Sequence, residues 1–259
     1  TCLHTDSKDR WLAVGTKAGM IALYDTENEL ATLEPIWLHV RNSPVKSIEF
    51  GRDGTKLFAT CEEGTIAMWD LSETILDASR EVFNGHESQI NSIAISGNGK
   101  VLVAGSDDRF VRTWNLAADD FISSTPTFSL NEEVELLQCS QRSNFLATAS
   151  KSNLKLWDLE SMPSSVPREI WNVGHDSPPN QLIFSENGRR LVASFDDRIL
   201  VWNLSEKSKN FSSLNIEGLA GRNTPEAESD PFEAASDLFV VASDLSGVDT
   251  YTRIVRISR

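Results

Sequence analysis

The stretch Glu81–Leu116, EVFNGHESQINSIAISGNGKVLVAGSDDRFVRTWNL, decides the fold. It contains four short runs, and in one of them, Asn91–Ser96, apolar Ile93 and Ile95 alternate with polar or small residues, the period of a half-buried β-strand. The turns between the later runs are Gly-Asn-Gly and Ser-Asp-Asp-Arg, and Gly and Asn tolerate the positive φ that tight turns require. The sequence therefore predicts four strands, at Glu81–Phe83, Asn91–Ser96, Val101–Ser106 and Phe110–Leu116.

The dipeptide that ends this stretch, Trp114-Asn115, recurs along the chain at a nearly constant interval. Dipeptides of the Trp-Asp type begin at positions 24, 69, 114, 157 and 202, so they lie 45, 45, 43 and 45 residues apart. Four strands of this length cannot bury both faces of their sheet alone, so similar units have to stack on one another. The spacing therefore predicts a repeat protein.

A Gly-His pair, a hydrophobic strand, a Ser-x-Asp turn and a terminal Trp-Asp or Trp-Asn together resemble the WD40 repeat. The resemblance extends over almost the whole chain and is weakest in about the last 55 residues. It implies an all-β fold, a β-propeller with about six visible four-stranded blades, the first incomplete, and part of a seven-bladed ring. The expected blades, all in one domain, are residues 1–27, 36–72, 81–117, 126–160, 169–205 and 210–259.

The two ends of the chain leave this ring unfinished. No first strand precedes the one expected at Leu3–Thr5, and the last expected strand belongs to the sixth blade. An open propeller would expose long strand edges, which promote aggregation. We therefore expect the chain to be part of a longer protein, with a further blade upstream or a partner chain that completes the ring.

The net charge of −14 and the sequence pI of about 4.7 limit the possible partners. Such a surface repels phosphate backbones and anionic lipid, so we expect no nucleic acid and no membrane among them. It favours other proteins, in particular basic peptides or basic domains, although acidity also serves solubility. No apolar run approaches the ~18–20 residues of a membrane helix, and the start of the chain has no signal-peptide pattern.

Metal and cofactor chemistry has little basis in the sequence. The four histidines are dispersed, the three cysteines have no metal-like spacing, and there is no glycine-rich phosphate loop. We therefore expect no metal, no cofactor and no catalytic residue. Cys61 and Cys139 occupy strand positions that should face a core, so we expect buried free thiols and an intracellular protein, cytoplasmic or nuclear.

A set of His, Ser, Asp and Trp residues could suggest a catalytic triad. The resemblance instead implies a structural tetrad of hydrogen-bonded side chains that ties a loop to two strands inside a blade. The set occurs twice, with the same Ser-to-Trp spacing of eight residues, and duplication favours a scaffold role because an enzyme needs one site. The residues are His86, Ser106, Asp108 and Trp114 in one blade and His175, Ser194, Asp196 and Trp202 in another. Blade two has Cys61 and Glu63 in the Ser and Asp places, and blade four has Ser150 and Ser152.

The resemblance also implies a binding face, the narrow one around the central channel. Its loops run from the outermost strand of one blade to the innermost strand of the next. The candidate partner-binding residues, just ahead of second strands, are Arg41, Asn42, Glu87, Ser88, Glu132, Glu133, Asp176 and Ser177.

These observations give a leading function and two alternatives. The leading hypothesis is a non-catalytic protein-interaction scaffold, a subunit of a hetero-complex or a domain of a larger chain. The first alternative is a sensor or regulatory propeller attached to an upstream catalytic or NTPase signalling domain. The second, an enzyme with its site at the propeller mouth, has no support in the sequence.

Overall fold

The computed structural model describes residues 2–8, 10–27, 34–41, 43–61, 64–72, 80–118, 127–160, 162, 166–185, 187–204, 211–215, 237–243 and 252–258. In this part of the chain there are 22 strands, which form five four-stranded sheets and one two-stranded sheet, all antiparallel. The predicted all-β fold is confirmed. No helix in the described ranges is long and apolar enough to cross a membrane.

The strands of each sheet pair in chain order. The first sheet contains β1 (Leu3–Thr5), β2 (Trp11–Gly15), β3 (Met20–Asp25) and β4 (Ile36–His39). The second contains β5 (Val45–Phe50), β6 (Lys56–Cys61), β7 (Thr65–Asp70) and β8 (Arg80–Asn84). The third contains β9 (Ile90–Ile95), β10 (Val101–Ser106), β11 (Phe110–Asn115) and β12 (Phe128–Ser129). The fourth contains β13 (Leu136–Cys139), β14 (Phe145–Ala149), β15 (Asn153–Asp158) and β16 (Arg168–Gly174). The fifth contains β17 (Gln181–Phe184), β18 (Arg190–Ser194), β19 (Arg198–Asn203) and β20 (Phe211–Asn215), and the last pair is β21 (Asp237–Ser243) and β22 (Thr252–Ser258).

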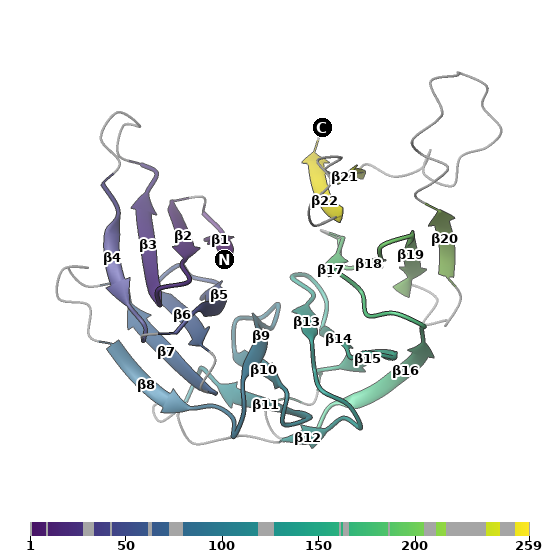
Figure 1. Ribbon diagram of the computed structural model, residues 1–259, viewed down its shortest axis with the longest axis horizontal. Helices are drawn as coiled ribbons and strands as arrows, with labels where there is room; N and C mark the ends of the chain where they lie inside the picture. Colours follow the sequence, from purple (N-terminus) through teal and green to yellow (C-terminus); the bar gives the residue numbers. More distant parts are fainter. Residues whose placement is uncertain are drawn as a thin grey trace.

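The five larger sheets fan along an arc about a common centre (Figure 1). The first strand of each sheet lies on the inner side of the arc, where β9 contacts both β5 and β13. Strands β4, β8, β16 and β20 lie on the outer side. This arrangement is that of propeller blades, and the described strands trace an open arc.

The sheets are offset from the sequence repeats, which corrects the expected blade boundaries. Strand β4 pairs with β3, and β8 pairs with β7, so the first strand of each repeat completes the preceding sheet. The expected blades 36–72, 81–117, 126–160 and 169–205 are therefore repeats rather than sheets. A period fixes the spacing of equivalent residues but not which strand closes which sheet. The first sheet is complete for this reason, whereas the expected blade 210–259 begins with β20, which belongs to the fifth sheet.

The hydrophobic core lies between neighbouring sheets, as stacking of incomplete units requires. Leu38 of the first sheet and Trp69 of the second share one cluster, and Phe58 of the second and Trp114 of the third share the next. Two further clusters join the third sheet to the fourth and the fourth to the fifth. The thiols of Cys61 and Cys139 are free and buried in these layers, as predicted.

Candidate functional site

Nine connections lie at the same end of the sheets and form what we call the loop face. Four of them, β4–β5, β8–β9, β12–β13 and β16–β17, carry the chain from the outer strand of one sheet to the inner strand of the next. The other five are the turns between the second and third strand of each sheet. Backbone hydrogen bonds join the two kinds, from Val45 N to Thr16 O (3.0 Å), His86 N to Gly64 O (2.8 Å), Val134 N to Ser106 O (3.1 Å) and His175 N to Ser152 O (2.9 Å).

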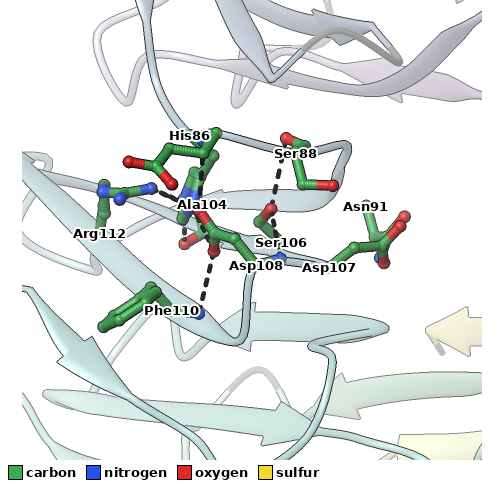
Figure 2. Close-up of polar contacts among 10 residues, drawn as sticks. His86, Ser88, Asn91, Ala104, Ser106, Asp107, Asp108, Phe110 and Arg112 are labelled. Atoms are coloured by element: carbon green, nitrogen blue, oxygen red, sulfur yellow. Dashed lines mark hydrogen bonds and ion pairs between the residues drawn. The ribbon is translucent and has the colours of Figure 1, made fainter.

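His86, on the β8–β9 link, has a fully buried imidazole that lies against the third sheet (Figure 2). Nε2 is 3.2 Å from Ala104 O, which can only accept, so we assign the proton to Nε2. Nδ1 then accepts from Arg112 Nη1 at 2.6 Å, and the same guanidinium nitrogen donates to Asp108 Oδ2 at 2.6 Å. Arg112 thereby offsets the charge of the Asp108 carboxylate, whose oxygens lie 2.9 Å from Nδ1. Burial lowers the pKa of His86, in keeping with a neutral ring.

Asp108 joins this link to the β10–β11 turn. Its carboxylate accepts from Phe110 N at 3.0 Å and from Glu87 N at 3.2 Å. Burial opposes the charge, but the hydrogen bond from Phe110 N and the hydrogen bond from the Arg112 guanidinium outweigh it and lower the pKa of Asp108. The turn also requires a positive φ of 70° at Arg109.

Ser106 has a different role from the one the resemblance implies. Its hydroxyl donates to Ser88 O at 3.3 Å and accepts from Asp108 N at 3.1 Å, so it caps the turn. The Trp114 ring meets the His86 ring edge-on, with centroids 6.4 Å apart. The structure thus brings His86, Asp108 and Trp114 together, but Ser106 does not contact the imidazole that a nucleophile would need.

Sequence reasoning missed Arg112, the group that sits between the acid and the imidazole. Residues 110, 112 and 114 of a strand lie on one face, and Trp114 was already assigned to this cluster. That alternation is the signal that could have identified Arg112.

In the fourth sheet, Glu132 joins the outer-to-inner link to the turn between the second and third strands, with the carboxylate on the link instead of on the turn. Its carboxylate, on the β12–β13 link, accepts from the Ser150 hydroxyl at 2.7 Å, from Ser152 N at 3.1 Å and from Asn153 Nδ2 at 3.2 Å. It also accepts from the Ser152 hydroxyl. These bonds, those from the two hydroxyls first, lower the pKa of Glu132 to about 2. The acceptor is on the link and the donors are on the turn, whereas in the third sheet the carboxylate is on the turn.

The second predicted tetrad is not assembled. The His175 ring packs edge-on against Phe195, with centroids 5.5 Å apart. Asp196 Oδ1 accepts from Asn180 Nδ2 at 2.8 Å. In the third sheet Asn91 Nδ2 makes the equivalent bond to Asp107 Oδ1 at 2.6 Å. Asp196 therefore takes the place of Asp107, not that of Asp108.

The strand register explains this difference. Trp114 pairs with Leu102, and Ser106 is four residues beyond Leu102, whereas Trp202 pairs with Leu191, and Ser194 is only three residues beyond it. Successive side chains of a strand point to opposite faces, so Ser194 faces the side opposite to that of Ser106. The equal spacing of eight residues conceals a difference in pairing, because Leu191 and Trp202 are one residue closer in the sequence than Leu102 and Trp114.

The candidate partner-binding residues come from all four links of the loop face. Arg41, Glu87 and Asp176 are exposed. Half-buried candidates are Ser88, Glu132, Glu133 and Ser177. Asn42, and Glu63 of the second sheet, lie outside the described residues. Of the two first-strand tryptophans, Trp37 is 56% exposed and Trp171 is buried. The described ranges contain no group of three or more His, Cys, Asp or Glu side chains that could hold a metal ion.

Family models match two parts of the chain. One described as the Vps8 beta-propeller matches residues 1–107, and one described as "WD domain, G-beta repeat" matches residues 168–203.

Curated relatives have modest identity. The nuclear distribution protein nudF of Aspergillus niger is 26% identical over 76% of this chain and 47% of its own length. The small ribosomal subunit protein RACK1 of Neurospora crassa is 26% identical over 55% of this chain and 45% of its own. The chain thus spans about half the length of these relatives. A chain in a solved structure titled "Crystal Structure of Mitotic Checkpoint Complex" has a TM-score of 0.67 at 19% identity, covering 82% of this chain and 62% of that one.

Proposed function

The chain belongs to the WD40-repeat β-propeller proteins, and from this premise we propose that it is a non-catalytic scaffold for protein–protein interaction, as a subunit or a domain of a larger assembly. The observation that carries the proposal is the loop face. Four consecutive outer-to-inner links present polar side chains on one surface. Sheets that fan about a common centre and present several loops on one side suit the gathering of partners, although a fold alone does not determine function.

Polar side-chain hydrogen bonds hold two of the four links in place. The β8–β9 link is held by Asp108, and the β12–β13 link is held by the donors around Glu132. Preorganised loops lose less conformational entropy on binding, so more of the contact energy appears as affinity. The polar groups around Asp108 and Glu132 form hydrogen bonds that fix these loops. They are therefore not available as catalytic groups, which favours a binding function over an enzymatic one.

The loop face is predominantly acidic around the last three of these links. Glu87, Asp176 and Asp196 are exposed and Glu133 is half-buried. Charge complementarity speeds association and selects partners, so a basic peptide or basic domain is the partner class we propose for this face. Buried free thiols suit a reducing compartment, and we place the protein inside the cell.

Affinity purification of the full-length protein followed by mass spectrometry tests this function. The matched pair of variants is Glu87→Arg with Asp176→Arg on the loop face, and Glu160→Arg, an exposed residue at the other end of the fourth sheet. We expect a partner that is lost with the first variant and retained with the second. If both variants retain the partner, the loop face is not its binding surface. Substrate turnover by the purified chain would reject the non-catalytic role.

A further inference from the structure

Five turns that follow an inner strand lie at the opposite end of the sheets, and the last four of them form a second surface, which we call the turn face. They are the β5–β6, β9–β10, β13–β14 and β17–β18 turns, each of which follows an inner strand. Each carries a basic residue at or next to its tip: Arg52, Lys100, Arg142 and Arg189. We refer to these four side chains as the basic patch.

Direct contacts make the four turns one continuous surface. The Arg52 guanidinium donates from Nη2 to Gln141 O at 2.9 Å and also contacts the Gln141 side chain, so it spans from the β5–β6 turn to the β13–β14 turn. The intervening β9–β10 turn is packed beneath it, because a Cβ on Gly99 would lie 3.1 Å from the Arg52 side chain. The β17–β18 turn joins through Ser143 Oγ, which donates to Gly188 O at 3.5 Å.

The close fit of these turns fixes their relative positions. A Cβ on Gly97 would lie 2.7 Å from Ser140 O, a distance that real Cβ atoms do not show, so only glycine allows the β9–β10 turn to approach so closely. Because the turns cannot shift independently, the basic residues they carry are held in a fixed pattern. A ligand would therefore meet a preformed surface.

The sign of this patch is opposite to that of the whole chain. The described residues of the four turns contain four cations and one carboxylate, Asp53, whereas the chain has a net charge of −14. The neighbouring β1–β2 turn, whose Ser7 hydroxyl donates to Arg52 O at 2.9 Å, adds Asp6, Lys8 and Arg10. The Asp53 carboxylate is hydrogen-bonded within its own turn, since Oδ1 accepts from Thr55 N at 2.9 Å and from the Thr55 hydroxyl at 2.8 Å. Glu186, in the β17–β18 turn by sequence, lies outside the described residues. Lys100 and Arg189 are exposed, and no described carboxylate forms an ion pair with either.

We propose that the basic patch is a second partner surface and that it binds an acidic peptide segment of a partner protein. A peptide fits better than a nucleic acid or an anionic membrane, because the large negative charge of the rest of the chain repels extended polyanions, whereas a short acidic segment can lie within the patch. The molecule then offers an acidic loop face at one end of the sheets and the basic patch at the other. This inference goes beyond the scaffold function of the loop face, and either surface can fail without the other.

The test is binding of a fluorescein-labelled peptide of alternating Glu and Ser to the full-length protein, followed by fluorescence anisotropy at low and at physiological ionic strength. The variant is Lys100→Glu with Arg189→Glu, and the matched control is Lys17→Glu with Lys151→Glu, two exposed lysines on the loop face. A second variant, Lys100→Gln with Arg189→Gln, removes the charge without reversing it. Circular dichroism establishes that each variant is folded.

We expect the peptide to bind, to bind more weakly as salt is added, and to lose roughly tenfold or more in affinity in the reversed variant with the control unchanged. The glutamine variant should fall between the two. Absence of binding, or equal binding by the variant and its control, would overturn the proposal. Tighter binding to single-stranded DNA or to phosphatidylserine vesicles than to the peptide would overturn the choice of partner.

Discussion

The Trp157 indole donates a hydrogen bond from Nε1 to the Thr148 hydroxyl at 2.9 Å, and both side chains are buried. Thr148 is two residues beyond Leu146, the strand partner of Trp157. The same place relative to the equivalent tryptophans of the second, third and fifth sheets is taken by alanine, at positions 59, 104 and 193. The fourth sheet therefore places a threonine hydroxyl at a position that the other three fill with a methyl group.

Replacing Thr148 with Val should destabilise the protein by ~1–3 kcal/mol, because it leaves the buried Trp157 donor without an acceptor. Urea unfolding measures this loss. Thr60→Val is the control, since Thr60 is also fully buried and its hydroxyl has no hydrogen-bond partner among the described residues. We expect Thr60→Val to be neutral or stabilising, and equal losses in the two variants would contradict the assignment.

His86→Ala should lower the melting temperature clearly more than His39→Ala. His86 is buried and contacts Arg112, Asp108 and Ala104 O, whereas His39 is exposed on β4. The loss of buried hydrogen-bond partners costs ~1–3 kcal/mol, which corresponds to a few degrees or more in a domain of this size. Thermal unfolding followed by circular dichroism checks the difference. Equal shifts would show that the cluster around His86 is not a stabilising tie.

Because of Glu132, the stability of the folded protein should decrease at acidic pH. Its pKa is about 2 in the folded protein against an ordinary value of 4.5, so its contribution is complete above pH 4.5 and is lost as the pH falls through about 2. Glu132→Gln should reduce stability at neutral pH and flatten this acid dependence in a series of melting temperatures. The control is Glu133→Gln, because Glu133 forms a partly exposed ion pair with Lys151, and such a pair contributes little to the free energy of unfolding. A curve for Glu132→Gln that parallels the wild type would count against the network.

A partly buried pair on the inner strands should produce the opposite pH dependence. His4 Nε2 on β1 lies 3.2 Å from Glu49 Oε2 on β5, and the Glu49 side chain is 13% exposed. Burial raises the pKa of Glu49 to about 8 despite a hydrogen bond from Ile95 N, and burial lowers the pKa of His4. Both directions describe a pair of neutral groups at neutral pH.

Because the folded pKa of Glu49 lies above its ordinary value of 4.5, its contribution to stability is complete below pH 4.5 and is lost as the pH rises through about 8. The wild-type free energy of unfolding should therefore fall between pH 5 and 8 relative to that of Glu49→Gln, by an amount on the order of a few kcal/mol. Urea unfolding at several pH values measures the difference. A constant difference across this range would mean that Glu49 is already ionised in the folded state.

The strand pattern of this protein could be predicted closely from its sequence. Lys56–Cys61 and Val101–Ser106 have the bounds that the apolar runs and the turn residues predicted, because each strand is specified by its own side chains. The candidate site was predicted less well. The polar cluster around His86 could be located from residue types, but the role of Arg112 depends on which strand residues share a face, and the fate of Ser194 depends on a one-residue difference in register.

The sequence by itself determined the period, the strands and the type of fold, since apolar alternation and turn chemistry are local and recur about every 45 residues. Only the tertiary structure decided which strand completes which sheet, how each hairpin is registered, and which turns meet. Arg52 and Gln141 are 89 residues apart and touch only because three sheets fan about one centre. Backbone pairing and the packing of turns bring such residues together, and neither can be recognised from the sequence of a single repeat.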